Sequence, residues 1–161
     1  MQHPVDFAVQ VLARNLQWIA AADGKVGPNL AIATAMFGIL AAIVPAATTL
    51  SALFLFAAAS AAVFLIGTIA SLAFAVFPRL SGSSRSLIFF GGIAQFDSDT
   101  YVDKLDKATA DELFDDLGRQ IHRNAEIAQT KHRHVRRGMA FLFLSVVPWL
   151  ISVSLYYAQQ G

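Results

Sequence analysis

Residues 26–78 form a run of 53 positions without Asp, Glu, Lys, Arg or His, built mostly from Ala, Leu, Ile, Val and Phe. The hydrocarbon core of a bilayer is about 30 Å thick and is crossed by roughly 20 apolar residues of helix. The run is therefore long enough for two spans joined by a tight turn. A second uncharged run, residues 138–161, supplies a third span. Together these runs predict an integral membrane protein.

The composition agrees with this interpretation. Hydrophobic residues make up 56% of the chain and charged residues only 14%, whereas charged residues make up about 25% of a typical soluble domain. What remains outside the lipid is too short for a separate large catalytic domain, so we expect one compact unit. The chain contains no cysteine, which excludes disulfides, thiolate metal sites and cysteine nucleophiles.

We predict an all-α fold with three transmembrane helices, divided into four segments. Residues 1–26 form an N-terminal amphipathic helix, residues 27–78 a transmembrane helical hairpin, residues 79–137 a cytoplasmic helical region, and residues 138–161 the third transmembrane helix. The cytoplasmic region is expected to run directly into the third span as one long helix.

The N-terminal segment has helical periodicity. Apolar residues recur at steps of three and four and are expected to form one stripe: Val5, Val9, Leu12, Leu16 and Ile19. Gly24, Gly27 and Pro28 follow, and we expect them to break or bend the chain before the first span. Such a helix lies on the membrane surface or packs against the later polar helix.

The spans carry small residues at four-residue steps, which favour close helix contacts within one molecule or between protomers. These residues are Thr34, Gly38 and Ala42 in the first span, and Ala57 with Ala61 and Gly67 with Ser71 in the second. Packing within the hairpin is the simpler of the two interpretations. In the third span, Pro148 removes the hydrogen bond to the carbonyl of Leu144 and predicts a kink.

The cations predict the topology. They flank the spans on one side only: Arg14, Lys25, Arg79, Arg85, Lys131, Arg133, Arg136 and Arg137. Cytoplasmic loops carry an excess of Lys and Arg. We therefore expect the N-terminus and residues 79–137 to be cytoplasmic and the C-terminus to lie on the opposite side of the membrane.

The cytoplasmic region is organised by charge. Residues 97–116 carry a net charge of −6 and residues 119–137 a net charge of +5. Thr109 followed by Glu112 is a capping box that starts the long helix. A shorter helix is expected over residues 98–107 and a loop over 81–85. Paired carboxylates such as those at positions 115 and 116 are expected on a solvated face.

The chain resembles the Pycsar transmembrane effectors. The resemblance rests on Trp18, Ala22, Asp23 and Lys25, which match a W-x-x-x-A-D-x-K pattern before the hairpin, and on Arg85, Phe89, Phe90, Ile93 and Ala94, which match an R-x-x-x-F-F-x-x-I-A pattern. Tyr101, the cap at residues 109–112, Arg119 with Gln120 and Ile121, and Lys131 occur in the family's order. The match covers nearly the whole chain.

This resemblance implies a bacterial anti-phage effector. Its activating ligand would be a cyclic pyrimidine mononucleotide, cUMP or cCMP, made by a partner cyclase, and it would impair the inner membrane and arrest growth or kill the cell. The protein would lie in the bacterial inner membrane with a periplasmic C-terminus, as a homo-oligomer in contact with the bilayer and without nucleic acid. No other cofactor is implied.

A cyclic mononucleotide needs cations or a helix N-terminus for its phosphate and an aromatic surface for its base. The candidate ligand-binding residues are Arg85, Phe89, Phe90, Tyr101, Lys25 and Lys131, and the structural or motif residues are Trp18, Asp23 and Arg119. Each has a structural alternative: the aromatic side chains are core or interfacial residues, and the acidic residue at position 23 pairs with Lys25 or Lys131.

Two other function classes stay open, namely a constitutive pore-forming or holin-like protein and a membrane-anchored adaptor for a soluble partner. We expect no enzyme activity and assign no catalytic residue, because no nucleophile with a base and an oxyanion donor is recognisable. His122, His132 and His134 lack a ligand spacing, so no metal site is expected.

Overall fold

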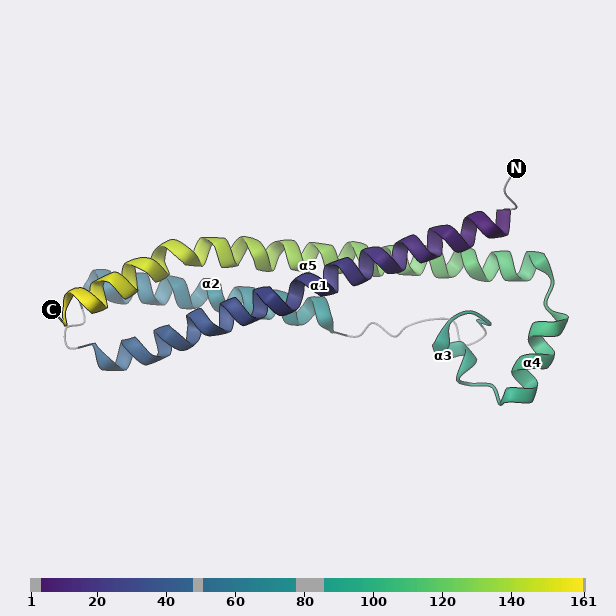
Figure 1. Ribbon diagram of the computed structural model, residues 1–161, viewed down its shortest axis with the longest axis horizontal. Coiled ribbons are helices and arrows are strands. Elements are labelled where there is room, and N and C mark those ends of the chain that lie inside the picture. Colours follow the sequence, from purple (N-terminus) through teal and green to yellow (C-terminus); the bar gives the residue numbers. More distant parts are fainter. Residues whose placement is uncertain (1–3, 48–50, 78–85, 161) are drawn as a thin grey trace. The chain divides into compact units, whose positions relative to one another are not determined.

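The computed structural model describes residues 4–47, 51–77 and 86–160, and these residues form helices and connecting segments without a strand. The helices are α1 (Pro4–Ala46), α2 (Ala52–Val76), α3 (Phe90–Ile93), α4 (Ser98–Lys107) and α5 (Ala110–Ala158) (Figure 1). The predicted all-α class is confirmed.

The chain forms two compact units. Unit 1 comprises the described residues within Met1–Ala21 and Pro78–Thr130, and unit 2 the described residues within Ala22–Phe77 and Lys131–Gly161. The first part of α1, α3, α4 and the first part of α5 therefore belong to unit 1. Unit 2 holds the remainder of α1 and α5 together with α2.

Three helices of the described chain, α1, α2 and α5, are long and apolar enough to cross a membrane. At most 33% of the residues in their apolar windows are buried within the protein. Large side chains such as Phe56, Phe74 and Phe143 are exposed. Because apolar side chains are stable in contact with lipid but not with water, unit 2 has the surface of a membrane bundle.

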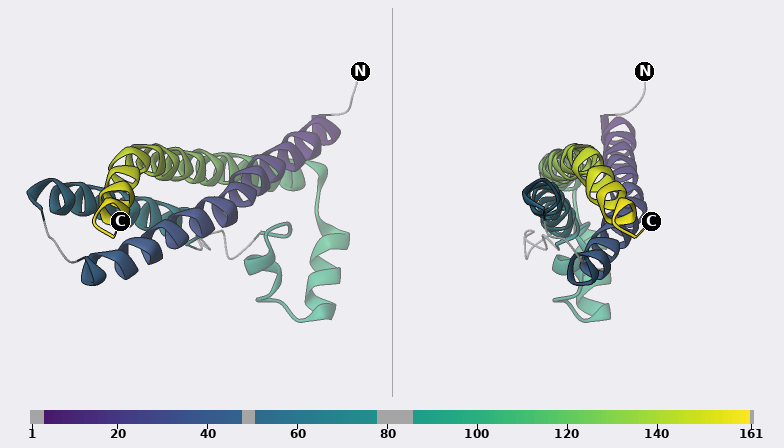
Figure 2. Two further views of the ribbon diagram at one scale, coloured as in Figure 1. Left: turned by 60° about the vertical axis from the view of Figure 1, so that its left-hand side comes forward. Right: turned by 90° about the vertical axis from the view of Figure 1, so that its left-hand side faces the viewer.

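The helices of unit 2 lie side by side in both views of Figure 2. Trp149 Nε1 of α5 donates to the carbonyl of Met36 in α1 over 3.0 Å. Lys131 and Asp23, earlier in the same two helices, also contact each other. The residue numbers of the contacts increase together along α1 and α5, so these two helices run in parallel. Helix α2 packs against both and runs in the opposite direction.

The core of unit 2 is apolar and built from all three helices. One cluster groups Leu40 and Ile43 of α1 with Phe54 and Leu65 of α2 and Leu142 of α5. A second joins five further buried residues: Ala22, Val26, Leu72, Ala75 and Val135. Of the predicted small-residue contacts, Ala57 and Ala61 are buried, whereas Thr34, Gly38 and Ala42 are exposed. The hairpin thus uses the small residues of its second helix.

Along α1 and along α5, the buried or half-buried residues recur at steps of three and four, which is the spacing of a coiled-coil seam. In unit 1 the seam of α1 contains Ala8, Leu12, Asn15 and Ile19, and that of α5 contains Leu117, Ile121, Asn124 and Ala128. Asn15 Nδ2 donates to the carbonyl of Ile121 over 3.0 Å. The N-terminal helix therefore packs against the polar helix, one of the two arrangements left open by the sequence.

Two sequence predictions about α1 are wrong. The predicted stripe is rotated, because Val9 and Leu16 are exposed while Ala8 is buried and Asn15 makes the interhelix contact. Of the break or bend expected at Gly24, Gly27 and Pro28, the break does not occur, because α1 continues through Pro28. Proline has no backbone N–H, so a helix that contains Pro28 lacks one of its hydrogen bonds. In the same turn, the side-chain Nδ2 of Asn29 donates to the carbonyl of Lys25 over 2.6 Å and so satisfies a neighbouring acceptor.

The predicted helix boundaries in the polar region are confirmed. α4 begins after Asp97, whose side chain accepts from Thr100 N, and ends at Lys107. α5 begins after Thr109: its N–H donates to Glu112 Oε2 over 2.9 Å, and Glu112 N donates to Thr109 Oγ1 over 3.3 Å. The helix then continues through Pro148. The predicted loop at residues 81–85 lies outside the described residues.

Candidate ligand pocket

The segment that precedes α3 is held against α5 by Asp116. Asp116 Oδ2 accepts from Ser86 Oγ over 2.9 Å and from the N–H of Leu87 over 2.8 Å. Ser86 Oγ, which is buried, in turn accepts from the N–H groups of Ile88 and Phe89 over 3.2 and 2.8 Å. The prediction of a purely solvated carboxylate at position 116 is therefore wrong, because this carboxylate satisfies two donors of a segment about thirty residues earlier.

Helix α4 is attached to the same segment from another side. The hydroxyl of Tyr101 donates to the carbonyl of Leu87 over 3.0 Å. The residues around Leu87 are thus fixed by hydrogen bonds to both α4 and α5, all within unit 1. Such fixed backbone gives the walls of a binding site a defined shape, which reduces the ordering cost of binding.

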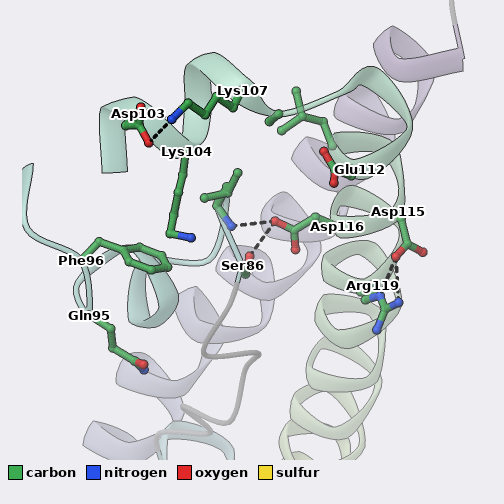
Figure 3. Close-up of a pocket in the computed structure, with 13 residues that line it drawn as sticks. Ser86, Gln95, Phe96, Asp103, Lys104, Lys107, Glu112, Asp115, Asp116 and Arg119 are labelled. Atoms are coloured by element: carbon green, nitrogen blue, oxygen red, sulfur yellow. Dashed lines mark hydrogen bonds and ion pairs between the residues drawn. The ribbon is translucent and has the colours of Figure 1, made fainter. Parts of the chain in front are cut away.

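An open pocket of about 880 Å³ lies where these three elements meet (Figure 3). This volume is within the range of small-molecule sites. Its lining combines aromatic, aliphatic, polar and charged side chains of unit 1: Ser86, Leu87, Gln95, Phe96, Asp103, Lys104, Lys107, Ala108, Glu112, Leu113, Asp115, Asp116 and Arg119.

Two cations of the lining are paired with carboxylates. Lys107 contacts Asp103 over 2.6 Å and Arg119 contacts Asp115 over 2.7 Å. The hydrogen bonds that Arg119 donates to the Asp115 carboxylate raise the pKa of Arg119. Both pairs are open to solvent, with every side chain more than half exposed. Exposed ion pairs are weak because solvent screens them, so a bound anion can displace the carboxylate from either cation at little cost.

The third cation, Lys104, has a different environment. Its ammonium lies 5.2 Å from the centre of the Phe96 ring, and it makes no ion pair with a carboxylate of the described residues. A cation beside an aromatic face is a combination suited to an anionic ligand that also carries a flat ring. Figure 3 shows Gln95, Phe96 and Lys104 on the same side of the pocket.

Two carboxylates near the pocket are kept ionised by helix caps. The N–H and hydroxyl of Thr109 lower the pKa of Glu112 below its ordinary value of 4.5. The N–H and hydroxyl of Thr100 likewise lower the pKa of Asp97 below 3.8. The lining contains three basic and four acidic side chains, so an anion must be recognised by individual cations rather than by the pocket's net charge.

The sequence-predicted site residues fall in different environments. Phe89 and Phe90 of unit 1 contact each other with ring centres 4.7 Å apart, and Tyr101 uses its hydroxyl within the fold. None of these three lines the pocket, whereas Arg119 does. Trp18 is exposed on α1. Arg85 lies outside the described residues.

The two predicted lysines belong to unit 2. Lys131 is paired with Asp23 over 2.5 Å, which decides between the two partners considered for that carboxylate. Lys25 is exposed. Sequence reasoning missed Phe96 and Lys104, although the cap residue at position 97 marks the place where the chain turns into α4. Within the described ranges, no group of three His, Cys, Asp or Glu side chains is arranged to hold a metal ion.

These features define a small helical membrane protein with a ligand-sized pocket in its polar unit. A family model for the Pycsar effector protein domain matches residues 7–158. The chain belongs to this family and is a cyclic-nucleotide-linked anti-phage membrane effector of bacteria. No curated protein and no solved structure matches the chain.

Proposed function

We propose that this effector is activated by cUMP or cCMP from a partner cyclase, that the nucleotide binds directly in the unit 1 pocket, and that the activated protein impairs the inner membrane. The observation that carries the proposal is the pairing of Lys104 with Phe96 inside a pocket of suitable size, in a chain of this family. The protein acts as a non-enzymatic effector.

The chemistry of the ligand matches this pair. A cyclic mononucleotide combines a phosphodiester with one negative charge and a flat pyrimidine ring. Lys104 supplies a cation that no carboxylate of the described residues pairs with, and Arg119 supplies a planar donor for phosphate oxygens. Phe96 supplies a face on which any base can stack, a contact worth roughly 1–3 kcal/mol per base. Neighbouring Gln95 offers an amide for the pyrimidine edge.

The topology is part of the proposal. The cations on one side of the spans support a cytoplasmic N-terminus, cytoplasmic residues 79–137 and a periplasmic C-terminus. A cyclase product would then reach unit 1 directly. The active form is a homo-oligomer in this proposal. The membrane response requires the nucleotide to bind that form more tightly than the resting one.

Binding is tested on the full-length protein in detergent by calorimetric titration with cUMP, cCMP and cAMP. Lys104→Gln is expected to weaken pyrimidine nucleotide binding at least about tenfold, the value of one charge-assisted hydrogen bond, and Phe96→Leu to do the same. Arg123→Gln removes a cation of unit 1 that does not line the pocket, so it serves as the matched control. Unchanged binding by both pocket variants would overturn this site.

The membrane response is tested in cells that contain the protein but no cyclase. Entry of a membrane-impermeant dye should follow supply of cUMP or cCMP and should be lost in Lys104→Gln. A constitutive pore predicts entry without nucleotide, and an adaptor predicts none in either condition. Either result would contradict the proposal.

A further inference from the structure

Three arginines end the charged part of α5: Arg133, Arg136 and Arg137. They lie three and four residues apart and therefore share one face of the helix. All three are exposed, whereas Lys131, Val135 and Gly138 between and beside them face the other helices of unit 2. The arginines consequently point away from the bundle.

These arginines have no carboxylate partner among the residues that the structure describes. Within the part of the chain that the structure describes, none of them makes an ion pair or hydrogen bond, whereas Lys107, Arg119, Arg123 and Lys131 are each paired. The sequence of unit 2 contains a single acidic residue, Asp23, which Lys131 occupies. Unit 2 therefore cannot neutralise its own arginine face.

The same face of α5 continues as an apolar surface. Phe143 and Leu144 follow Arg136 and Arg137 by seven residues, two turns along the helix, and both are exposed. Seven residues correspond to a rise of about 10 Å. A phospholipid has this order of groups, with a phosphate at the membrane surface and acyl chains about 10 Å deeper.

We propose that Arg133, Arg136 and Arg137 bind the headgroup of an anionic phospholipid whose chains lie along Phe143 and Leu144. Arginine matches phosphate oxygens with two parallel hydrogen bonds. A zwitterionic lipid carries its own cation next to the phosphate and therefore neutralises the charge of the arginines poorly. The surface should prefer a lipid with a net negative charge. A free phosphate ion would leave the apolar half of the surface unused. This site does not require a nucleotide.

Lipid selectivity is measured on the full-length protein reconstituted in phosphatidylcholine vesicles, by electron spin resonance of spin-labelled phosphatidylglycerol and phosphatidylcholine. The lipid whose motion is restricted by contact with the protein should be enriched at least about fivefold in phosphatidylglycerol over phosphatidylcholine. This ratio corresponds to about 1 kcal/mol for one cation at an anionic headgroup. Substituting all three arginines with Gln should abolish this preference, and substituting them with Lys should retain part of it.

The matched control removes three cations of unit 1 instead, as Lys104→Gln, Lys107→Gln and Arg123→Gln, and should keep the preference. Inorganic phosphate should weaken the enrichment no more than chloride of the same ionic strength, and stronger competition by phosphate would identify a free-ion site. No preference in the wild-type protein, or an unchanged preference in the triple Gln variant, would overturn the proposal. If the triple variant fails to insert, as judged by flotation with vesicles, each single variant should lower the enrichment and none doing so would contradict it.

Discussion

Lys131 of α5 lies 2.5 Å from Asp23 of α1, and its side chain is 14% exposed while that of Asp23 is 44% exposed. Lys131 occupies a seam position of α5, next to buried Val135 and Ala128. A single charged residue in a helical seam fixes the relative position of the two helices, because only one alignment supplies its partner. The ion pair thus specifies how α1 meets α5 within unit 2.

Asp23→Asn should destabilise the protein by about 1–2 kcal/mol, between the values for exposed and fully buried pairs, since Lys131 then keeps its charge in a largely enclosed position. Thermal unfolding in detergent, followed by tryptophan fluorescence, measures the loss. The reversed pair, Asp23→Lys with Lys131→Asp, should recover part of it. Lys25→Gln is the control, because Lys25 makes no ion pair with the described residues. Equal Tm values for Asp23→Asn and Lys25→Gln would contradict this role.

Gly138 and Gly38 offer a matched comparison of helix packing. A Cβ on Gly138 would lie 2.9 Å from Cδ2 and 3.0 Å from Cγ of Leu72, which is fully buried in α2. Gly138→Ala should therefore destabilise the α2–α5 contact by about 1–3 kcal/mol. A Cβ on Gly38 meets no atom of the described residues within 4 Å. Gly38→Ala should leave Tm unchanged or raise it, because alanine favours helix by up to about 1 kcal/mol.

Both effects are read from thermal unfolding in the same detergent, where detergent replaces lipid equally for the two variants. A lower Tm for Gly38→Ala than for Gly138→Ala would contradict the prediction, because it would place Gly38 rather than Gly138 on the packed face of its helix.

The sequence predicted features that depend on local chemistry. The bounds of α4 and the cap at Thr109 and Glu112 follow from side chains that satisfy N–H groups three residues away, so neighbouring residues contain the whole signal. The spans follow equally from uninterrupted apolar composition, since each segment must satisfy its own backbone in lipid. Neither inference needs knowledge of tertiary contacts.

Features that depend on distant residues were predicted less well. The face of α1 was misassigned because Val9 and Leu16 are apolar but exposed, while Ala8 is buried. Hydrophobicity alone cannot choose between two apolar faces of one helix. From the sequence, the partner of Asp23 could have been either Lys25 or Lys131. Lys25 is two residues away on the same helix and points to a different side, so only the approach of α5 brings Lys131 to the carboxylate.

The pocket could not be derived from spacing. Phe96 and Lys104 are eight residues apart and meet because α4 folds back beside the segment that contains Phe96. Ser86 and Asp116 are separated by thirty positions. A serine and an aspartate in a polar region are usually solvated. The residue types alone therefore gave no indication that Ser86 and Asp116 would hydrogen-bond to each other.

Asp116→Asn tests whether this network shapes the pocket. The amide keeps the size of the carboxylate but weakens acceptance from Ser86 Oγ and Leu87 N, because hydrogen bonds to a charged acceptor are roughly twice as strong. We expect nucleotide affinity to fall about tenfold and amide hydrogen exchange of residues 87–89 to accelerate. Asp115→Asn is the control: it removes the same charge from the pocket, but among the described residues the Asp115 side chain bonds only to Arg119. Exchange that is equally fast in both variants would show that loss of charge, rather than of positioning, is responsible.

Acid should loosen the start of α5 through Glu112. Its pKa is lowered in the folded protein by the N–H and hydroxyl of Thr109, so the folded state binds the proton less readily than the unfolded chain. The stabilisation is therefore complete above the ordinary value of 4.5 and is lost as pH falls below it through the lowered pKa. Hydrogen exchange of residues 110–113, corrected for the intrinsic pH dependence of exchange, should rise over this range. Glu112→Gln should remove the dependence, while Asp111→Asn, an exposed neighbour, should preserve it. A pH-independent start of α5 in the wild-type protein would mean that the cap does not hold the carboxylate ionised.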